Sequence, residues 1–237
     1  MLSQKPIPAR ERLILPLDVP DIVEAKRIVT DLGDAVAFYK LGLEIFLSGR
    51  IYDLVDWLAE RNKKIFADIK FFDVPNTVRS AVRQLKGRGV AFTTVHGNDE
   101  ILRAAVEEKN EVKILAVTVL TSLDQGDVDA LGFKVDVRAL VLSRARRALE
   151  IGCDGVISSG IEVDGLRHAL GDNFLIVVPG IRPVANCEVD DQKRTVDVED
   201  AFRSGADYIV VGRPIRKAAN PREAAEKIQD RIAALFA

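Results

Sequence analysis

The chain has 237 residues, of which 48% are hydrophobic and 30% charged, and its formal net charge is -2 at pH 7. This length suits one large domain or two small ones, and the composition is that of a globular protein with a substantial core. The small net charge gives no sign of a nucleic-acid partner or a membrane surface, and no apolar run approaches the ~18 residues of a membrane span. With only Cys153 and Cys187, no disulfide framework is expected, which favours free thiols and a cytoplasmic location.

Residues 1–12 are polar, contain two prolines and lack the apolar stretch of a signal peptide. We expect them to form a short, loosely held lead-in.

Residues 13–237 then alternate between two patterns. The first is a set of eight apolar, mostly β-branched runs typical of parallel strands covered on both faces. These runs are residues 13–19, 38–44, 64–70, 91–97, 112–120, 155–160, 174–180 and 208–214.

The second pattern is helical spacing between the runs. One apolar stripe follows the first run, another follows the second, and a last helix is expected at residues 221–236 after an Asn-Pro start. The stripes are Ile22, Ala25, Ile28, Val29 and Leu32; Ile51, Leu54, Val55 and Leu58; and Ala224, Ile228, Ile232 and Leu235. Eight βα units without a linker predict a single-domain (β/α)8 TIM barrel. A doubly wound open sheet is the alternative, but the first βα turn lacks a glycine-rich dinucleotide fingerprint.

In such a barrel, reacting side chains lie at the C-terminal ends of the strands. Polar residues gather at those ends of the predicted runs: Asp18, Lys40, Asp68, Lys70, His96, Thr121, Ser122, Arg182 and Arg213. The starts of the runs carry only scattered lysines such as Lys64 and Lys113. The one-sided distribution predicts a functional site at the C-terminal end of the barrel.

The third run places three ionisable groups close together. Asp68 is the non-apolar residue between Ile65 and Ile69, and Lys70 follows two positions later, so both side chains point to one face. Asp73 follows at the start of a turn. Because desolvating an unpaired charge is costly, this alternating string predicts a reactive site, with a buried structural ion pair as the alternative.

Several motifs spread from Leu13 onward carry a resemblance to a known family. They are Asp68-x-Lys70-x-x-Asp73-x-x-Asn76-Thr77, Tyr39-Lys40-Leu-Gly-Leu-Glu44, Leu120-Thr-Ser122, Val178-Pro-Gly-Ile-Arg182-Pro183, Asp191-Gln192-Lys-Arg194 and Val211-Gly-Arg213-Pro214. With these motifs the chain resembles the orotidine 5′-monophosphate decarboxylases of the bacterial type. The resemblance implies conversion of orotidine 5′-monophosphate to uridine 5′-monophosphate and carbon dioxide in pyrimidine biosynthesis, with neither metal nor organic cofactor.

The resemblance also assigns the charged residues. Lys70 would stabilise and then protonate the carbanion at C6 of the pyrimidine, which is electrostatic preorganisation. Asp68 would lie near the departing carboxylate and hold Lys70 charged and oriented. Lys40 would extend this network and, with Asp18, bind the ribose from within the same chain. Asp73, together with Thr77, would come from the neighbouring subunit of a homodimer with shared active sites.

The remaining assignments concern the two ends of the substrate. Phosphate needs backbone N–H groups and an arginine fork, which Gly212 and Arg213 could supply. Arg182 and the long polar loop at residues 183–196 form a second element, with Gln192 as the phosphate contact that the resemblance implies. A loop of this length and polarity could act as a lid.

On the same resemblance, Ser122 would bond the pyrimidine amide, with Thr121 as an accessory. His96 remains open, as either a structural or a substrate-adjacent histidine.

Two rival functions keep the same fold. One is a 3-keto-gulonate-phosphate decarboxylase or hexulose-phosphate synthase, whose metal-dependent chemistry uses an acidic residue where this chain has Lys40. A cation at this position is poor for binding Mg²⁺. The other is a non-catalytic phosphate-ligand-binding barrel, which would have no use for Asp68. Fold alone does not decide between these functions, whereas the site residues do.

Overall fold

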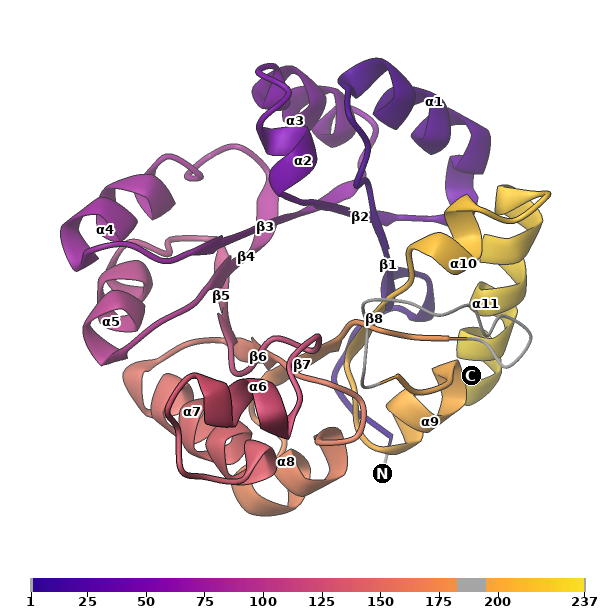
Figure 1. Ribbon diagram of the computed structural model, residues 1–237. Helices are drawn as coiled ribbons and strands as arrows, with labels where there is room; N and C mark the ends of the chain where they lie inside the picture. Colours follow the sequence, from indigo (N-terminus) through magenta and orange to yellow (C-terminus); the bar gives the residue numbers. More distant parts are fainter. Residues whose placement is uncertain (1, 183–194, 237) are drawn as a thin grey trace.

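The computed structural model describes residues 2–182 and 195–236. Within these residues, eight parallel strands follow one another in chain order and close into a barrel, because β1 pairs with β8 as well as with β2. Viewed along the barrel axis, the helices form a ring outside the strands (Figure 1). The (β/α)8 prediction is therefore confirmed, and the doubly wound alternative is wrong.

The strands start close to the predicted runs, and all but β3, which ends one residue later, end earlier. Their bounds are β1 Leu13–Pro16, β2 Phe38–Leu41, β3 Lys64–Phe71, β4 Val90–Val95, β5 Lys113–Val117, β6 Gly155–Ile157, β7 Leu175–Val178 and β8 Tyr208–Val210. Beyond the last paired residues the chain stays apolar and buried, as at Leu17, Val19 and Val119. The apolar pattern reports burial rather than strand pairing, which is why the predicted runs are too long.

The helices cover the outside of the barrel with their apolar faces. Their bounds are α1 Ile22–Leu32, α2 Leu43–Phe46, α3 Ile51–Ala59, α4 Pro75–Arg83, α5 Asp99–Glu107, α6 Gln125–Ala130, α7 Val137–Ile151, α8 Val163–Leu170, α9 Val198–Arg203, α10 Arg213–Arg216 and α11 Pro221–Leu235, with short 3₁₀ turns at Ala9–Glu11 and Gly33–Ala35. The predicted stripes are buried, except that Ile28 and Leu235 are only partly covered and Ala225 takes the place expected for Ala224. No helix in residues 2–182 and 195–236 is long and apolar enough to cross a membrane.

Two apolar layers hold the barrel together. A large cluster lies between strands and helices, and a smaller one fills the barrel interior. Aromatic rings from the alternate strands β2, β4 and β8 meet across the interior, with Phe38 and Phe92 at a centroid distance of 5.0 Å and Tyr208 packed edge-on against both. This packed layer lies directly below the C-terminal end of the barrel. It closes the lower end of any site built there.

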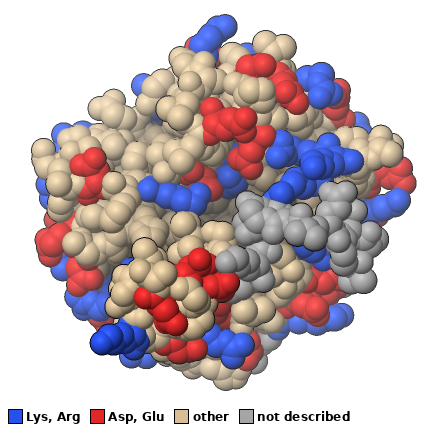
Figure 2. Space-filling model, viewed as in Figure 1, with Lys and Arg blue, Asp and Glu red and all other residues tan. Residues whose placement is uncertain are grey.

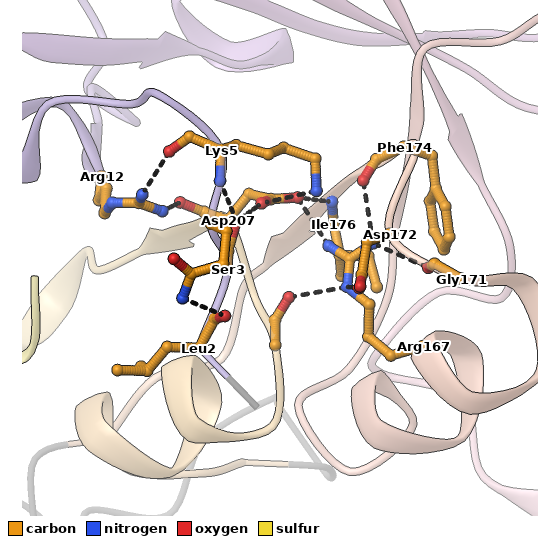
Figure 3. A network of polar contacts seen from close by, with 12 residues as sticks. Leu2, Ser3, Lys5, Arg12, Arg167, Gly171, Asp172, Phe174, Ile176 and Asp207 are labelled. Carbon is orange, nitrogen blue, oxygen red and sulfur yellow. Dashed lines mark hydrogen bonds and ion pairs between the residues drawn. The ribbon is translucent and has the colours of Figure 1, made fainter.

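A buried polar network fixes the opposite, N-terminal end of the barrel (Figure 3). Asp207 is 0% exposed and accepts hydrogen bonds from Ser3, from Lys5 at 3.1 Å and from Arg167 at 2.7 Å. Arg12, which is 1% exposed, donates to the backbone oxygens of Asp207 and Lys5. The described part of the lead-in is therefore bound to the barrel, and the expectation of a loosely held segment is wrong.

Candidate active site

A cavity of about 350 Å³ opens at the C-terminal ends of the strands. Every second residue of a strand points into the barrel. The inward-pointing residues nearest the C-terminal end of each strand lie above the interior layer and therefore line the cavity. On β3, for example, Phe66 belongs to the interior layer and also forms the floor of the cavity, and Asp68 and Lys70 stand above it. Figure 2 shows acidic and basic side chains gathered around the hollowed centre of this face.

Four charged side chains of alternating sign form a row across this cavity. Lys40 on β2 lies between two carboxylates, with its Nζ 3.3 Å from Asp18 Oδ1 and 3.1 Å from Asp68 Oδ2. Lys70 Nζ lies 2.9 Å from Asp68 Oδ1. Residues that lie on β2 and β3 and just after β1 are thus brought into direct contact.

The row keeps its inner members charged. Burial alone would lower the pKa of Lys40, but the carboxylates of Asp68 and Asp18 outweigh it and raise that pKa. Burial would likewise raise the pKa of Asp68, yet the ammonium groups of Lys40 and Lys70 outweigh it and lower the pKa of this carboxyl. An ionised carboxylate and an ammonium group are therefore in place before any ligand binds.

The backbone at Lys70 has an unusual conformation that the sequence pattern did not reveal. Its φ of 53° lies in the left-handed region, which costs a residue with a Cβ atom about 1–2 kcal/mol. Thr94, on the neighbouring strand β4, accepts a hydrogen bond from the Lys70 backbone N–H and donates one to Asp68. Sequence reasoning missed Thr94 because a threonine in a β-branched run looks like an ordinary strand residue.

Arginine side chains line the part of the cavity formed by the ends of β7 and β8. Arg182 and Arg213 both lie there, as predicted, together with Gly212 and with Arg216, which was not predicted. A Cβ atom at Gly212 would lie 2.9 Å from the Pro16 ring, so the close approach of the chain after β8 to the end of β1 requires glycine. Arg216 donates to the backbone oxygen of Asp18 and so ties this part of the cavity to the charged row.

Thr121 and Ser122 line the cavity from the segment that follows β5, as predicted. Gln192 lies outside the described residues. Asp73 and Thr77 do not line the cavity and are exposed.

His96 does not line the cavity either. Its ring packs edge-on against Phe72 at 5.4 Å, in a separate depression that also contains Arg144. Burial, together with the nearby cations Arg144 and Lys70, lowers the pKa of this imidazole. The structure therefore favours a structural role for His96 over a place beside the substrate.

The fold and the cavity define a β/α barrel with a charged, arginine-lined site at the C-terminal ends of its strands. Comparison with known proteins is more specific. The model of the "Orotidine 5'-phosphate decarboxylase / HUMPS family" matches residues 11–228. The chain therefore belongs to this family, and the resemblance inferred from its motifs is confirmed.

Individual relatives agree with this family. The chain is 62% identical to a protein of Methylococcus capsulatus named orotidine 5'-phosphate decarboxylase, over 100% of this chain and 98% of the relative. It is 48% identical to a protein of the same name from Xanthomonas euvesicatoria, over 98% and 97% of the two chains. The crystal structure of orotidine 5'-phosphate decarboxylase from Lactobacillus acidophilus superposes with a TM-score of 0.82 at 35% identity, covering 94% of this chain and 99% of that one.

Proposed function

We propose that this protein decarboxylates orotidine 5′-monophosphate to uridine 5′-monophosphate and carbon dioxide, a step of pyrimidine biosynthesis. The observation that carries the proposal is the row of alternating charges that ends at Lys70 inside the cavity. The volume of about 350 Å³ lies in the range of small-ligand sites. The names of the relatives over the whole chain length support the same reaction.

The reaction breaks the bond between C6 of the pyrimidine and its carboxylate carbon, and the electron pair stays on C6. The ring does not delocalise this pair, so a fixed positive charge beside C6 is the means of stabilising it. The Lys70 ammonium group, held 2.9 Å from Asp68, is such a charge. After carbon dioxide leaves, Lys70 gives a proton to C6 and recovers one from solvent.

Asp68 has two roles in this mechanism. Its carboxylate orients Lys70 through Oδ1 and contacts Lys40 through Oδ2, so one buried group fixes two cations. It also faces the substrate carboxylate, and two like charges at close range repel each other. That repulsion is relieved as carbon dioxide departs, which adds to the stabilisation that Lys70 provides.

The rest of the cavity would bind the parts of the substrate that do not react. Asp18 and Lys40 would bind the ribose hydroxyls. Arg213 would bind the phosphate beside the backbone of Gly212, with Arg182 close by. Binding energy from the phosphate can then lower the barrier of the reaction at C6, because the two groups are covalently joined.

Ser122 would bond the pyrimidine amide, with Thr121 beside it, from the segment after β5. Gln192, which lies outside the described residues, would complete the phosphate site.

We further propose that the enzyme is a cytoplasmic homodimer in which Asp73 and Thr77 complete the partner's site. The two apolar residues on either side of Asp73 support this assignment, because Phe72 is 69% and Val74 64% exposed in the single chain. Apolar side chains of this size, grouped around a functional residue, are typical of a surface that another chain covers. The buried free thiol of Cys153 fits a reducing compartment.

A spectrophotometric assay with orotidine 5′-monophosphate tests the proposed function, with loss of the orotate absorbance as the signal and uridine 5′-monophosphate identified as the product. Lys70→Ala, which removes the cation beside C6, is expected to abolish turnover while the circular dichroism spectrum is retained. Near-normal activity of this variant would contradict the mechanism. Activity that disappears in excess EDTA, or turnover of 3-keto-gulonate phosphate instead, would favour the metal-using relatives.

A further inference from the structure

Thr94 is a buried polar residue next to the charged row, and the reaction as described above gives it no role. It lies on β4, one residue before the strand ends, and its exposure is 0%. Its position continues the inward-facing column above Phe92, a residue of the interior layer. Thr93, directly before it, is also 0% exposed and serves as an internal comparison.

The pairing between β3 and β4 is interrupted where Thr94 lies. Ala67 pairs with Thr93 and Phe71 pairs with Val95, so residues 68–70 on β3 stand opposite Thr94 alone. Such a bulge removes regular ladder hydrogen bonds and leaves backbone groups in need of other partners. The Lys70 N–H finds its partner in the Thr94 hydroxyl oxygen, at 2.9 Å.

The direction of each hydrogen bond at Thr94 follows from the chemistry of its partners. The Lys70 backbone N–H can only donate, so the Thr94 oxygen accepts from it. The ionised Asp68 carboxylate can only accept, so the Thr94 O–H donates to Oδ1 at 2.8 Å. The same Oδ1 accepts from Lys70 Nζ at 2.9 Å. One hydroxyl thus closes a ring of hydrogen bonds that runs through both the backbone and the side chain of Lys70.

We propose that Thr94 is a positioning residue for the decarboxylation, because its hydroxyl holds Lys70 in the left-handed conformation and aligns Asp68 with the Lys70 ammonium. This inference rests on the proposed function. Without the hydroxyl, the Lys70 N–H loses its partner, and a strained residue relaxes when its surroundings no longer hold it. The ammonium then moves relative to C6, and a displacement of about 1 Å at a reacting group can cost roughly 10²-fold in rate.

The test compares Thr94→Val with Thr93→Val. Each substitution removes one buried hydroxyl that bonds to β3, since Thr93 donates to the Ala67 backbone oxygen at 2.9 Å, a group outside the charged row. For Thr94→Val we expect kcat to fall about 10- to 100-fold, the range for losing a hydrogen bond to a charged group, with KM close to wild type. For Thr93→Val we expect a similar shift in the urea midpoint and an unchanged kcat. Thr94→Ser retains the hydroxyl and is expected to recover most of the lost rate.

Three results would overturn the proposal: wild-type kcat in Thr94→Val, equal losses of kcat in Thr94→Val and Thr93→Val, or no recovery in Thr94→Ser. If Thr94→Val does not fold, Thr94→Ala is measured against Thr93→Ala by the same criteria. Wild-type protein that leaves orotidine 5′-monophosphate unchanged would contradict the proposed function itself. An active wild type with an equally active Thr94→Val would contradict only the role of Thr94.

Discussion

The buried carboxylate of Asp207 offers a sharp test of what holds this barrel together. Its Oδ1 accepts from Ser3 and Lys5, and its Oδ2 accepts from Arg167 and from the backbone N–H of Ile176 at 2.8 Å. Asp207→Asn preserves the size of the side chain but removes its charge. The Lys5 and Arg167 cations then lose their shared counter-charge, and an amide N–H₂ faces a donor on whichever side it points.

The size of the effect follows from burial. Asp207 is 0% exposed, and the side chains of Arg167 and Lys5 are only 9% and 22% exposed. Removing one partner of a buried ion pair costs about 3–5 kcal/mol. We therefore expect Asp207→Asn to lower the free energy of unfolding by about this amount. In a chain of this length the corresponding fall in melting temperature is roughly 10 °C.

Urea unfolding followed by circular dichroism, at one protein concentration, measures this loss. Asp172→Asn is the matched control, because Asp172 lies 3.7 Å from the same Arg167 but its side chain is 77% exposed. An exposed pair of this kind contributes about 0–1 kcal/mol. If Asp207→Asn destabilises the protein no more than Asp172→Asn, the network at the N-terminal end of the barrel does not have the importance assigned to it. At temperatures where the variant is folded, its kcat is expected to stay at the wild-type value.

Three further results are expected. Gly42→Ala places a Cβ atom 2.8 Å from Asp18 Oδ1 at a φ of -93°, so KM should rise about 10-fold through displacement of this carboxylate while the urea midpoint stays constant. A mixture of equal amounts of Lys70→Ala and Asp73→Ala chains should regain about one quarter of wild-type activity, because half of all dimers then contain one chain of each kind and one intact site out of two. No recovery despite subunit exchange would exclude a shared site. The pKa of His96 is lowered in the folded state, so below the ordinary histidine pKa of 6.5 the unfolded chain binds a proton more readily than the folded one. The free energy of unfolding should therefore fall as the pH drops below 6.5. Measured at pH values above and below 6.5, this fall should be smaller in a His96→Gln variant.

Much of the fold and of the charged site could be predicted from the sequence, because both depend on simple periods. Apolar runs that begin 19 to 43 residues apart locate the strands, and the two-residue alternation within a run places Asp68 and Lys70 on one face. Lys40, near the end of the adjacent strand β2, falls beside them because neighbouring parallel strands end at the same level. Local chemistry and topology were sufficient for these residues.

What the sequence did not reveal depends on contacts between segments far apart in the chain. Asp207 looks like a polar residue before a strand, and its burial follows only when the lead-in residues and Arg167 fold against it. The left-handed backbone of Lys70 arises from the bulge against β4, and no residue type in the sequence indicates that bulge. The role of Thr94 depends on that bulge, so it could not be inferred before the register of the two strands was known.

The two halves of the barrel contribute different parts of the site. The charged row lies on or just after the first three strands, whereas Arg182 and Arg213 follow the last two. In the proposed mechanism, phosphate anchoring and bond cleavage would therefore reside on segments that could be exchanged separately. An enzyme engineer seeking a different phosphorylated substrate could vary the residues around Arg182 and Arg213 and leave the strands of the charged row untouched. The same modularity offers a physical route by which barrels of this family could diversify their substrates while keeping one electrostatic core.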